Sequence, residues 1–195
     1  DAADAFHEGL ARVRSKAYNK MGFDMWGYID QTGKIIIPIK YDNASNFIMG
    51  EATVWLNNKQ LIINKNGKEL TPLKYDGSLP TSEGIQLVYN GKYPSMKFGF
   101  IDDTGKEIIS LIYDGAYSFT EGLAAVKRNG KWGFIDKTGK EIIQLQYDDA
   151  GQFKEGLALV NKGGKTDKDG FFVGGKYGFI DRTGKISIPL VYDKA

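Results

Sequence analysis

The residues of this chain that could carry out chemistry are mostly carboxylates, and they return at regular intervals. Glu-Gly pairs place a carboxylate at Glu8, Glu83, Glu121 and Glu155. An Asp or Asn also opens five segments of the form Asp/Asn-x-x-Gly-Lys, which are Asp30–Lys34, Asn64–Lys68, Asp102–Lys106, Asp136–Lys140 and Asp181–Lys185. Carboxylates in this number could bind a divalent cation or supply the acid and base pair of a glycoside hydrolase.

A hairpin turn explains the recurring aspartates without a metal. An Asp or Asn at the first position accepts backbone N–H bonds from the turn that follows it. The glycine three residues later supplies the positive φ of a type I turn closed by a G1 bulge. For the Glu-Gly pairs we expect a turn glycine and a glutamate paired with a repeated lysine, with a ring of carboxylates as the alternative. We therefore predict no catalytic and no metal-binding residue.

Composition excludes several other classes of site. The chain has 195 residues, no cysteine and one histidine, His7, which rules out thiolate sites and multi-histidine metal centres. Lys and Arg number 26 against 24 Asp and Glu, a balance that argues against a nucleic-acid partner. Apolar runs such as Ile35–Ile37 are too short for membrane insertion. We expect no cofactor, and since Asp1 is not a methionine we expect a processed or excised piece.

Five copies of one unit account for the regular spacing. Tyr-Asp pairs divide the chain, read from Asp to Tyr, into repeats 1–41, 42–75, 76–113, 114–147 and 148–192. In repeat 4 the strand-like segments are 123–126, 132–136 and 141–147, which flank the Asp136–Lys140 turn. Residues 147–153 form either a fourth short strand or an irregular turn. The sequence predicts an all-β fold with three to four short antiparallel strands per repeat.

The sequence alone does not decide whether the array of repeats is a closed ring or an open one. A sheet of about 34 residues cannot bury its faces alone, so each repeat must pack against its neighbours and share a core with them. A propeller-like ring of five small blades and an open β-solenoid both satisfy this requirement, and we slightly favour the ring. In either form, residues 1–195 are predicted to be one domain.

The segment Gly130–Lys140, with Tyr147-Asp148 and residues 153–157 after it, resembles the WG repeat family, also called KWG repeats. The resemblance extends over the whole chain in about five repeats of this bacterial tandem-repeat group. Repeat 2 departs from it, with Gln60-Leu61 in place of the aromatic-glycine pair and Met49-Gly50 in place of Glu-Gly. The resemblance implies a non-enzymatic binding or scaffold module at the bacterial envelope or outside the cell, although a cytoplasmic location is not excluded.

The repeats differ mainly in the length of one connection, before the aromatic-glycine pair. It is long at Arg14–Met25, Tyr89–Lys97 and Asn161–Lys176. Insertions on one side of a repeat array are frequent binding sites, and aromatic residues in them are informative. The alternative is that the insertions extend their hairpins and pack on one another. The candidate ligand-binding residues are Tyr18, Phe23, Tyr93, Phe171 and Phe172.

One insertion also resembles part of a calcium-binding loop. Asp167 and Asp169 stand two apart, but the third acidic ligand and the closing glutamate are missing, so we expect a polar turn there. The leading hypothesis for the whole chain is therefore a module that binds a protein or a glycan. A glycan-active enzyme with paired carboxylates and a purely structural spacer are the alternatives.

Overall fold

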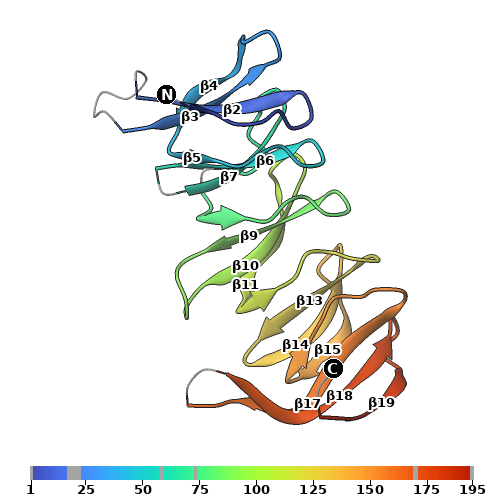
Figure 1. Ribbon diagram of the computed structural model, residues 1–195. Helices are drawn as coiled ribbons and strands as arrows, with labels where there is room; N and C mark the ends of the chain where they lie inside the picture. The colour runs from blue at the N-terminus through green and yellow to red at the C-terminus, as the bar shows by residue number, and fades with distance from the viewer. Residues whose placement is uncertain (1, 17–22, 58, 73, 169–170, 194–195) are drawn as a thin grey trace. The chain divides into compact units, whose positions relative to one another are not determined.

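A computed structural model describes residues 2–16, 23–57, 59–72, 74–168 and 171–193. The chain forms two compact units, residues 1–80 and residues 81–195. Within the described ranges the regular structure is β, without an α-helix, and it forms five small antiparallel sheets of three or four strands (Figure 1). The all-β prediction is confirmed. No helix in these ranges has the length and apolar character to cross a membrane.

Unit 1 contains two sheets in chain order. The first consists of β1 (Ala2–Ala3), β2 (Leu10–Ser15), β3 (Met25–Asp30) and β4 (Ile35–Tyr41). The second consists of β5 (Asn43–Ala44), β6 (Glu51–Leu56) and β7 (Lys59–Asn64). The short strand β8 (Gly77–Ser78) follows near the end of the unit. Each sheet is a meander in which neighbours along the chain pair antiparallel.

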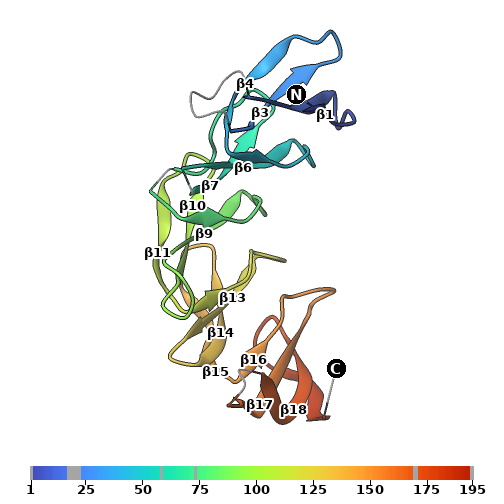
Figure 2. The same cartoon turned by 60° about the vertical axis from the view of Figure 1, so that its left-hand side comes forward.

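Unit 2 contains three sheets of the same kind, which Figures 1 and 2 show in succession along the chain. The first pairs β9 (Ile85–Asn90), β10 (Lys97–Asp102) and β11 (Glu107–Tyr113). The second pairs β12 (Gly115–Ala116), β13 (Leu123–Arg128), β14 (Lys131–Asp136) and β15 (Glu141–Tyr147). The third pairs β16 (Asp149–Ala150), β17 (Leu157–Thr166), β18 (Phe172–Asp181) and β19 (Ile186–Tyr192). The segment 147–153 thus contains a short fourth strand.

Both faces of the repeat 4 sheet contribute buried residues, because alternate residues of a strand point to opposite sides. On β14, Phe134 belongs to the core shared with repeat 5, whereas Ile135 belongs to the core shared with repeat 3. Both side chains are almost completely buried. In unit 1 the two sheets share a single core that includes Tyr28 and Ile63. Neighbouring repeats therefore share cores, one in unit 1 and two in unit 2 among the described residues.

A repeated aromatic contact joins neighbouring sheets. In repeats 2, 4 and 5 the phenylalanine five residues after the first Asp packs against an aromatic ring of the preceding repeat. Centroid distances are 4.9 Å for Tyr28–Phe47, 5.0 Å for Phe100–Phe119 and 4.8 Å for Phe134–Phe153, with the planes tilted by about 60°. Edge-to-face pairs of this kind stabilise packing beyond the area that they bury.

Candidate functional site

The aspartates of the Asp-x-x-Gly-Lys segments are engaged in turns, as predicted. Asp136 Oδ1 accepts hydrogen bonds from Thr138 N at 2.9 Å, Thr138 Oγ1 at 2.6 Å and Lys140 N at 3.1 Å. Gly139 has φ +83° and donates its N–H to the Asp136 carbonyl. The same arrangement occurs at Asp30, Asp102 and Asp181, and Asn64 accepts two of these bonds. These carboxylates hold hairpins closed.

The glutamates of the Glu-Gly pairs connect one repeat to the next. The Glu8 carboxylate accepts from Met49 N at 2.7 Å and Gly50 N at 2.9 Å, and it pairs with Lys65. Glu83 and Glu121 accept from the Gly122 and Gly156 amides in the same way. Lys137 pairs with Glu83 at 3.1 Å. The expected Glu–Lys pairing is confirmed at these two sites.

The sequence analysis did not predict the hydrogen bonds that backbone N–H groups of the following repeat donate to these glutamates. The sequence does, however, contain a pattern that indicates contact between the two repeats. A cation follows the turn Asp or Asn at Lys65, Lys137 and Arg182, each in a repeat that comes after a Glu-Gly repeat. Repeat 3 instead has Asp103 at this position, and the repeat before it has Met49 where the glutamate would be. The two positions change together, as expected of contacting residues.

The Asp of each Tyr-Asp pair is a third structural carboxylate. Asp114 pairs with Lys97 and accepts a bond from Asn129 N at 2.8 Å. Asp148 pairs with Lys131 and accepts from Gly163 N at 2.7 Å. Each aspartate thereby joins the lysine of the preceding repeat to its own sheet, at the β13–β14 connection for Asp114 and at β17 for Asp148.

These bonds lower the pKa of eight described carboxyls. Hydrogen bonds from Thr138 lower the pKa of Asp136, and the bond from Lys65 lowers that of Glu8. Burial acts to raise the pKa of Glu83, but the contacts with Lys137 and the Gly122 amide outweigh it and the pKa falls. The other carboxyls whose pKa is lowered are Asp30, Asp102, Asp114, Asp148 and Asp181. Burial raises the pKa of Asp149, in the opposite direction.

Acid should therefore destabilise the fold. A carboxyl whose folded pKa is lowered binds fewer protons in the native state, so its stabilisation is complete above the unfolded pKa near 4. That stabilisation is lost as the pH falls from about 5 through 4 towards the lowered folded values. We expect the melting temperature, followed by circular dichroism, to fall steadily from pH 5 to pH 2.5. Asp136→Asn should reduce this dependence, and a melting temperature that is constant below pH 5 would contradict the assignment.

The aromatic residues predicted in the insertions have different surroundings. Tyr93 is 89% exposed and Phe171 69% exposed, each in the connection of a hairpin of unit 2. The ends of β9–β10 and β17–β18 that carry these connections lie on the same, left-hand side of unit 2 in Figure 1. Phe23, in unit 1, is 67% exposed. Tyr18 lies outside the described residues.

Phe172 differs from its neighbour because it packs on its own hairpin. Thr166 pairs with Phe172, so this insertion extends β17 and β18, as the alternative interpretation held. A Cβ at Gly164 would lie 2.2 Å from Phe172 Cζ, which means that the ring covers this glycine. Asp167 accepts a bond from Phe171 N at 2.9 Å, and Asp169 lies outside the described residues. Phe171 is thus the exposed ring of the pair.

A stacked aromatic pair in repeat 4 was not predicted. The rings of Tyr117 and Trp132 lie 5.4 Å apart with an interplanar angle of 21°, and Lys127 Nζ is 5.8 Å from the Trp132 ring. Asp149 of repeat 5 is near enough to interact electrostatically with Tyr117 and Lys127, and Tyr177 of the same repeat interacts with Asp149. Burial raises the pKa of both Tyr117 and Asp149. The group combines flat apolar faces with an ammonium, a carboxylate and a phenol.

Trp132 is less buried than Phe134, which lies two residues further along β14. It packs against the core shared by repeats 4 and 5 but remains only partly buried. The register explains the difference, because Trp132 pairs with Lys127 next to the hairpin connection, whereas Phe134 pairs with Ala125 in the middle of the sheet. Trp26 of repeat 1 is also partly buried, with the Arg12 guanidinium 4.9 Å from its ring.

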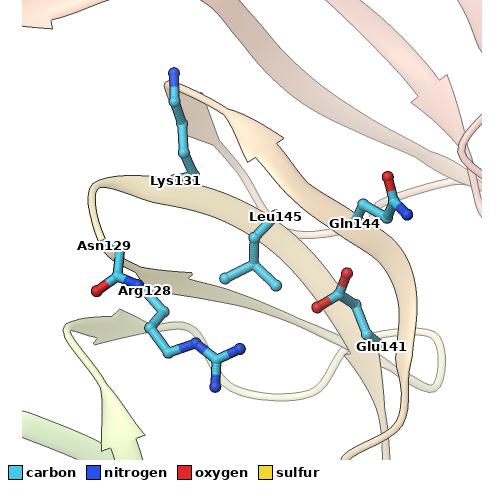
Figure 3. Close-up of a pocket in the computed structure, with 6 residues that line it drawn as sticks. All are labelled: Arg128, Asn129, Lys131, Glu141, Gln144 and Leu145. Atoms are coloured by element: carbon cyan, nitrogen blue, oxygen red, sulfur yellow. The ribbon is translucent and has the colours of Figure 1, made fainter.

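A polar depression in repeat 4 is formed by the β13–β14 hairpin, which carries Trp132, together with β15. Figure 3 shows its lining, which is mostly exposed and consists of Arg128, Asn129, Lys131, Glu141, Gln144 and Leu145. Its volume is about 340 Å³. Lys131 is already paired with Asp148. Among the described residues no three His, Asp or Glu side chains converge as they would around a metal ion.

Short antiparallel meanders that share cores, joined by repeated contacts, define a tandem β-repeat protein. The family model of the WG containing repeat matches at five positions, residues 26–59, 62–93, 98–132, 132–165 and 177–195. The chain belongs to this family, and the predicted resemblance is confirmed with its five repeats.

Similarity to solved structures is remote. The tricorn protease matches with a TM-score of 0.45 and 12% identity over 94% of this chain, which spans 25% of the tricorn protease chain. Apo AztD from Citrobacter koseri matches with a TM-score of 0.34 and 12% identity, over 95% of this chain and 69% of its own. No curated protein matches the chain.

Proposed function

We propose that the chain is a non-enzymatic binding module whose partner, a protein or a glycan, docks on the side of unit 2 that carries its long hairpin connections. The observation behind this proposal is the set of exposed aromatic rings there, above all Tyr93 and Phe171. Solvated connections rarely need such side chains. Aromatic anchors commonly dominate the energy of an interface, at about 2 kcal/mol or more each.

The stacked pair Tyr117–Trp132 adds to this side, because Trp132 is adjacent to the connection between β13 and β14. Two stacked rings present a flat apolar surface, and Lys127 and Asp149 supply a charged donor and an acceptor beside it. A small number of polar groups around apolar contacts is the common composition of a ligand site. This combination suits a sugar ring as well as a protein side chain.

The non-enzymatic part of the proposal rests on the recurring carboxylates. Asp136 is bound to its turn, Glu121 to the Gly156 amide, and Asp148 to Lys131. A glycosidase needs two carboxylates that are free to exchange protons across a substrate.

As part of the same proposal, the module works at the bacterial envelope or outside the cell. Fractionation of the producing cells would test this location.

Binding is tested by comparing the parent protein with the double variant Tyr93→Ser/Phe171→Ser. Both proteins are applied to a glycan array and, in parallel, to a bacterial lysate whose captured proteins are identified by mass spectrometry. We expect partners of the parent to lose at least tenfold in affinity for the variant, since each lost anchor of this size amounts to about a factor of ten or more. The matched control is Lys168→Ser, a polar change in the same insertion. Equal binding by parent and double variant would contradict the proposal.

A further inference from the structure

The stacked rings of Tyr117 and Trp132 are the centre of a set of side chains from two neighbouring sheets of unit 2. Lys127 of β13 has its Nζ 5.8 Å from the Trp132 ring. Asp149 of β16 interacts electrostatically with Tyr117 and with Lys127, and Tyr177 of β18 interacts with Asp149. We call these five residues the Tyr117 group.

Backbone pairing explains why these side chains meet. Lys127 pairs with Trp132 on one side and with Gly115 on the other. A Cβ at Gly115 would lie 3.3 Å from the Trp132 ring, so the indole extends over this glycine. Asp149 has the equivalent position in repeat 5, where it pairs with Asn161. A carboxylate thus replaces a glycine there and lies close to the rings of the preceding repeat.

The Tyr117 group occurs once in the chain. Tyr117 has no aromatic equivalent in the other repeats, and the residues at the position of Asp149 are Ala2, Asn43, Gly77 and Gly115. Because the other sheets form without these side chains, the group is not needed to build a repeat.

The tryptophan of repeat 1 has a different environment, in which every nearby charge has a partner. The guanidinium groups of Arg12 and Arg14 lie 4.9 Å and 5.7 Å from the Trp26 ring. Arg12 pairs with Asp4, and Arg14 pairs with Asp24 at 3.1 Å. The polar groups around this indole are therefore already satisfied within their own sheet.

The Tyr117 group is open by comparison. Tyr117 is 41% exposed, and Trp132, Lys127 and Asp149 are partly exposed. Trp132 covers one face of the Tyr117 ring, so the exposed area of that ring lies on its other face and its edge. Asp149 forms no salt bridge with any described residue. An exposed aromatic face therefore lies beside a carboxylate that can still accept hydrogen bonds.

A neutral pyranose sugar has the shape and polarity that this group matches. Its ring C–H bonds form flat apolar faces, which pack on an aromatic face because that face is the negative pole of the ring quadrupole. Its hydroxyls lie at the rim, where a carboxylate can accept from them and an ammonium can donate to them, and hydrogen bonds to charged groups are the stronger ones. The charges of Lys127 and Asp149 cancel, whereas an acidic sugar or an amino sugar would each meet one like charge.

We propose that the Tyr117 group is a subsite for one neutral pyranose unit of a glycan. This subsite rests on the proposed function, since it gives the class of ligand that the binding module takes. The sugar ring stacks on the open face of Tyr117, the Asp149 carboxylate accepts hydrogen bonds from its hydroxyls, and the Lys127 ammonium donates one to a sugar oxygen.

The test begins with immobilised glycans of glucose, galactose, mannose or N-acetylglucosamine, beside glycans that contain uronic acids or free amino sugars. We expect the parent protein to bind members of the neutral set, and isothermal titration calorimetry then gives the Kd of the strongest. Tyr117→Ala should raise this Kd at least tenfold, as expected for an aromatic anchor. No binding of any neutral glycan by the parent, or an unchanged Kd in Tyr117→Ala, would overturn the proposal.

Ile142→Ala is the matched control for the loss of the ring. Ile142 is 40% exposed, lies in the same repeat and is not part of the Tyr117 group. This variant should bind the glycan with the Kd of the parent. A loss as large as that of Tyr117→Ala would overturn the proposal, because the effect would then not depend on the ring.

Asp149→Asn tests the carboxylate without removing a ring. The amide keeps the size of the side chain but leaves Lys127 as the net charge of the subsite. We expect the affinity for the neutral glycan to fall about fivefold and binding of glycans with uronic acids to increase. An unchanged preference would overturn the role of Asp149. Circular dichroism checks folding, and this isosteric variant decides the question if Tyr117→Ala does not fold.

The sugar subsite and the proposed function can fail separately. A protein partner that is lost in Tyr93→Ser/Phe171→Ser, with no glycan bound by the parent, would support the proposed function and overturn the subsite. A neutral glycan that is lost in Tyr117→Ala but kept in the double variant would support the subsite and contradict docking on Tyr93 and Phe171.

Discussion

The variant Phe134→Ala should lose about 3–5 kcal/mol of folding free energy, the range measured for deletion of a buried phenylalanine ring. Phe134 is completely buried and contacts Phe153 of the next repeat at a centroid distance of 4.8 Å. Removing the ring would leave a cavity between two sheets that cannot collapse without moving both. Urea denaturation measures the loss, at an unchanged slope if the two end states stay the same.

Phe171→Ala is the matched control for this prediction, since it makes the same chemical change at an exposed site. Phe171 is 69% exposed and belongs to neither core of unit 2, so the expected cost stays within about 0.5 kcal/mol. If both variants lose the same free energy, the assignment of Phe134 to a core between repeats is wrong.

The second large effect is expected from Gly133→Ala. A Cβ at this position would lie 2.5 Å from the Ile143 carbonyl oxygen and 2.7 Å from Gln144 C and Leu145 N. All three atoms belong to the backbone of β15, so the strand itself must move. We expect a loss of about 3 kcal/mol, in the upper range for overpacking, and a melting temperature lower by roughly 6–12 °C.

Gly151→Ala tests whether the close approach, rather than the loss of a glycine, causes this effect. Gly151 is not one of the glycines with positive φ, and a Cβ there would meet Leu159 Cβ at 3.7 Å, an ordinary contact. Its substitution should change stability by less than about 0.5 kcal/mol. Comparable losses in the two variants would show that the approach of β15 does not require Gly133.

The turns and strands could be predicted from the sequence because their causes are local. Asp136 and Gly139 belong to one turn, and its hydrogen bonds close within five residues. The close approach at Gly133 also has a local signal, since a glycine inside a strand often marks the close approach of another backbone. Alternation along a strand likewise accounts for Phe134 and Ile135 lying in different cores.

The contacts between repeats were harder to predict because they depend on how one sheet is placed against the next. The bond from Gly156 to Glu121 spans 35 residues, and no periodicity within a repeat encodes it. The stack of Tyr117 on Trp132 was missed because Tyr117 has no aromatic equivalent in the other repeats, where Asp4, Ser45, Leu79 and Gly151 stand at its position. The candidate rings Tyr93 and Phe171 were found because aromatic residues are unusual in such connections.

Recurring residues build the repeats, whereas the proposed binding residues are unshared aromatic residues in the connections, such as Tyr93 and Phe171. The most direct test is the melting temperature of Tyr93→Ser/Phe171→Ser. We predict a value within about 2 °C of the parent, because exposed substitutions cost little and 1 kcal/mol corresponds to roughly 2–4 °C in a protein of this size. A fall as large as that of Phe134→Ala would contradict the account, since these rings would then belong to the core.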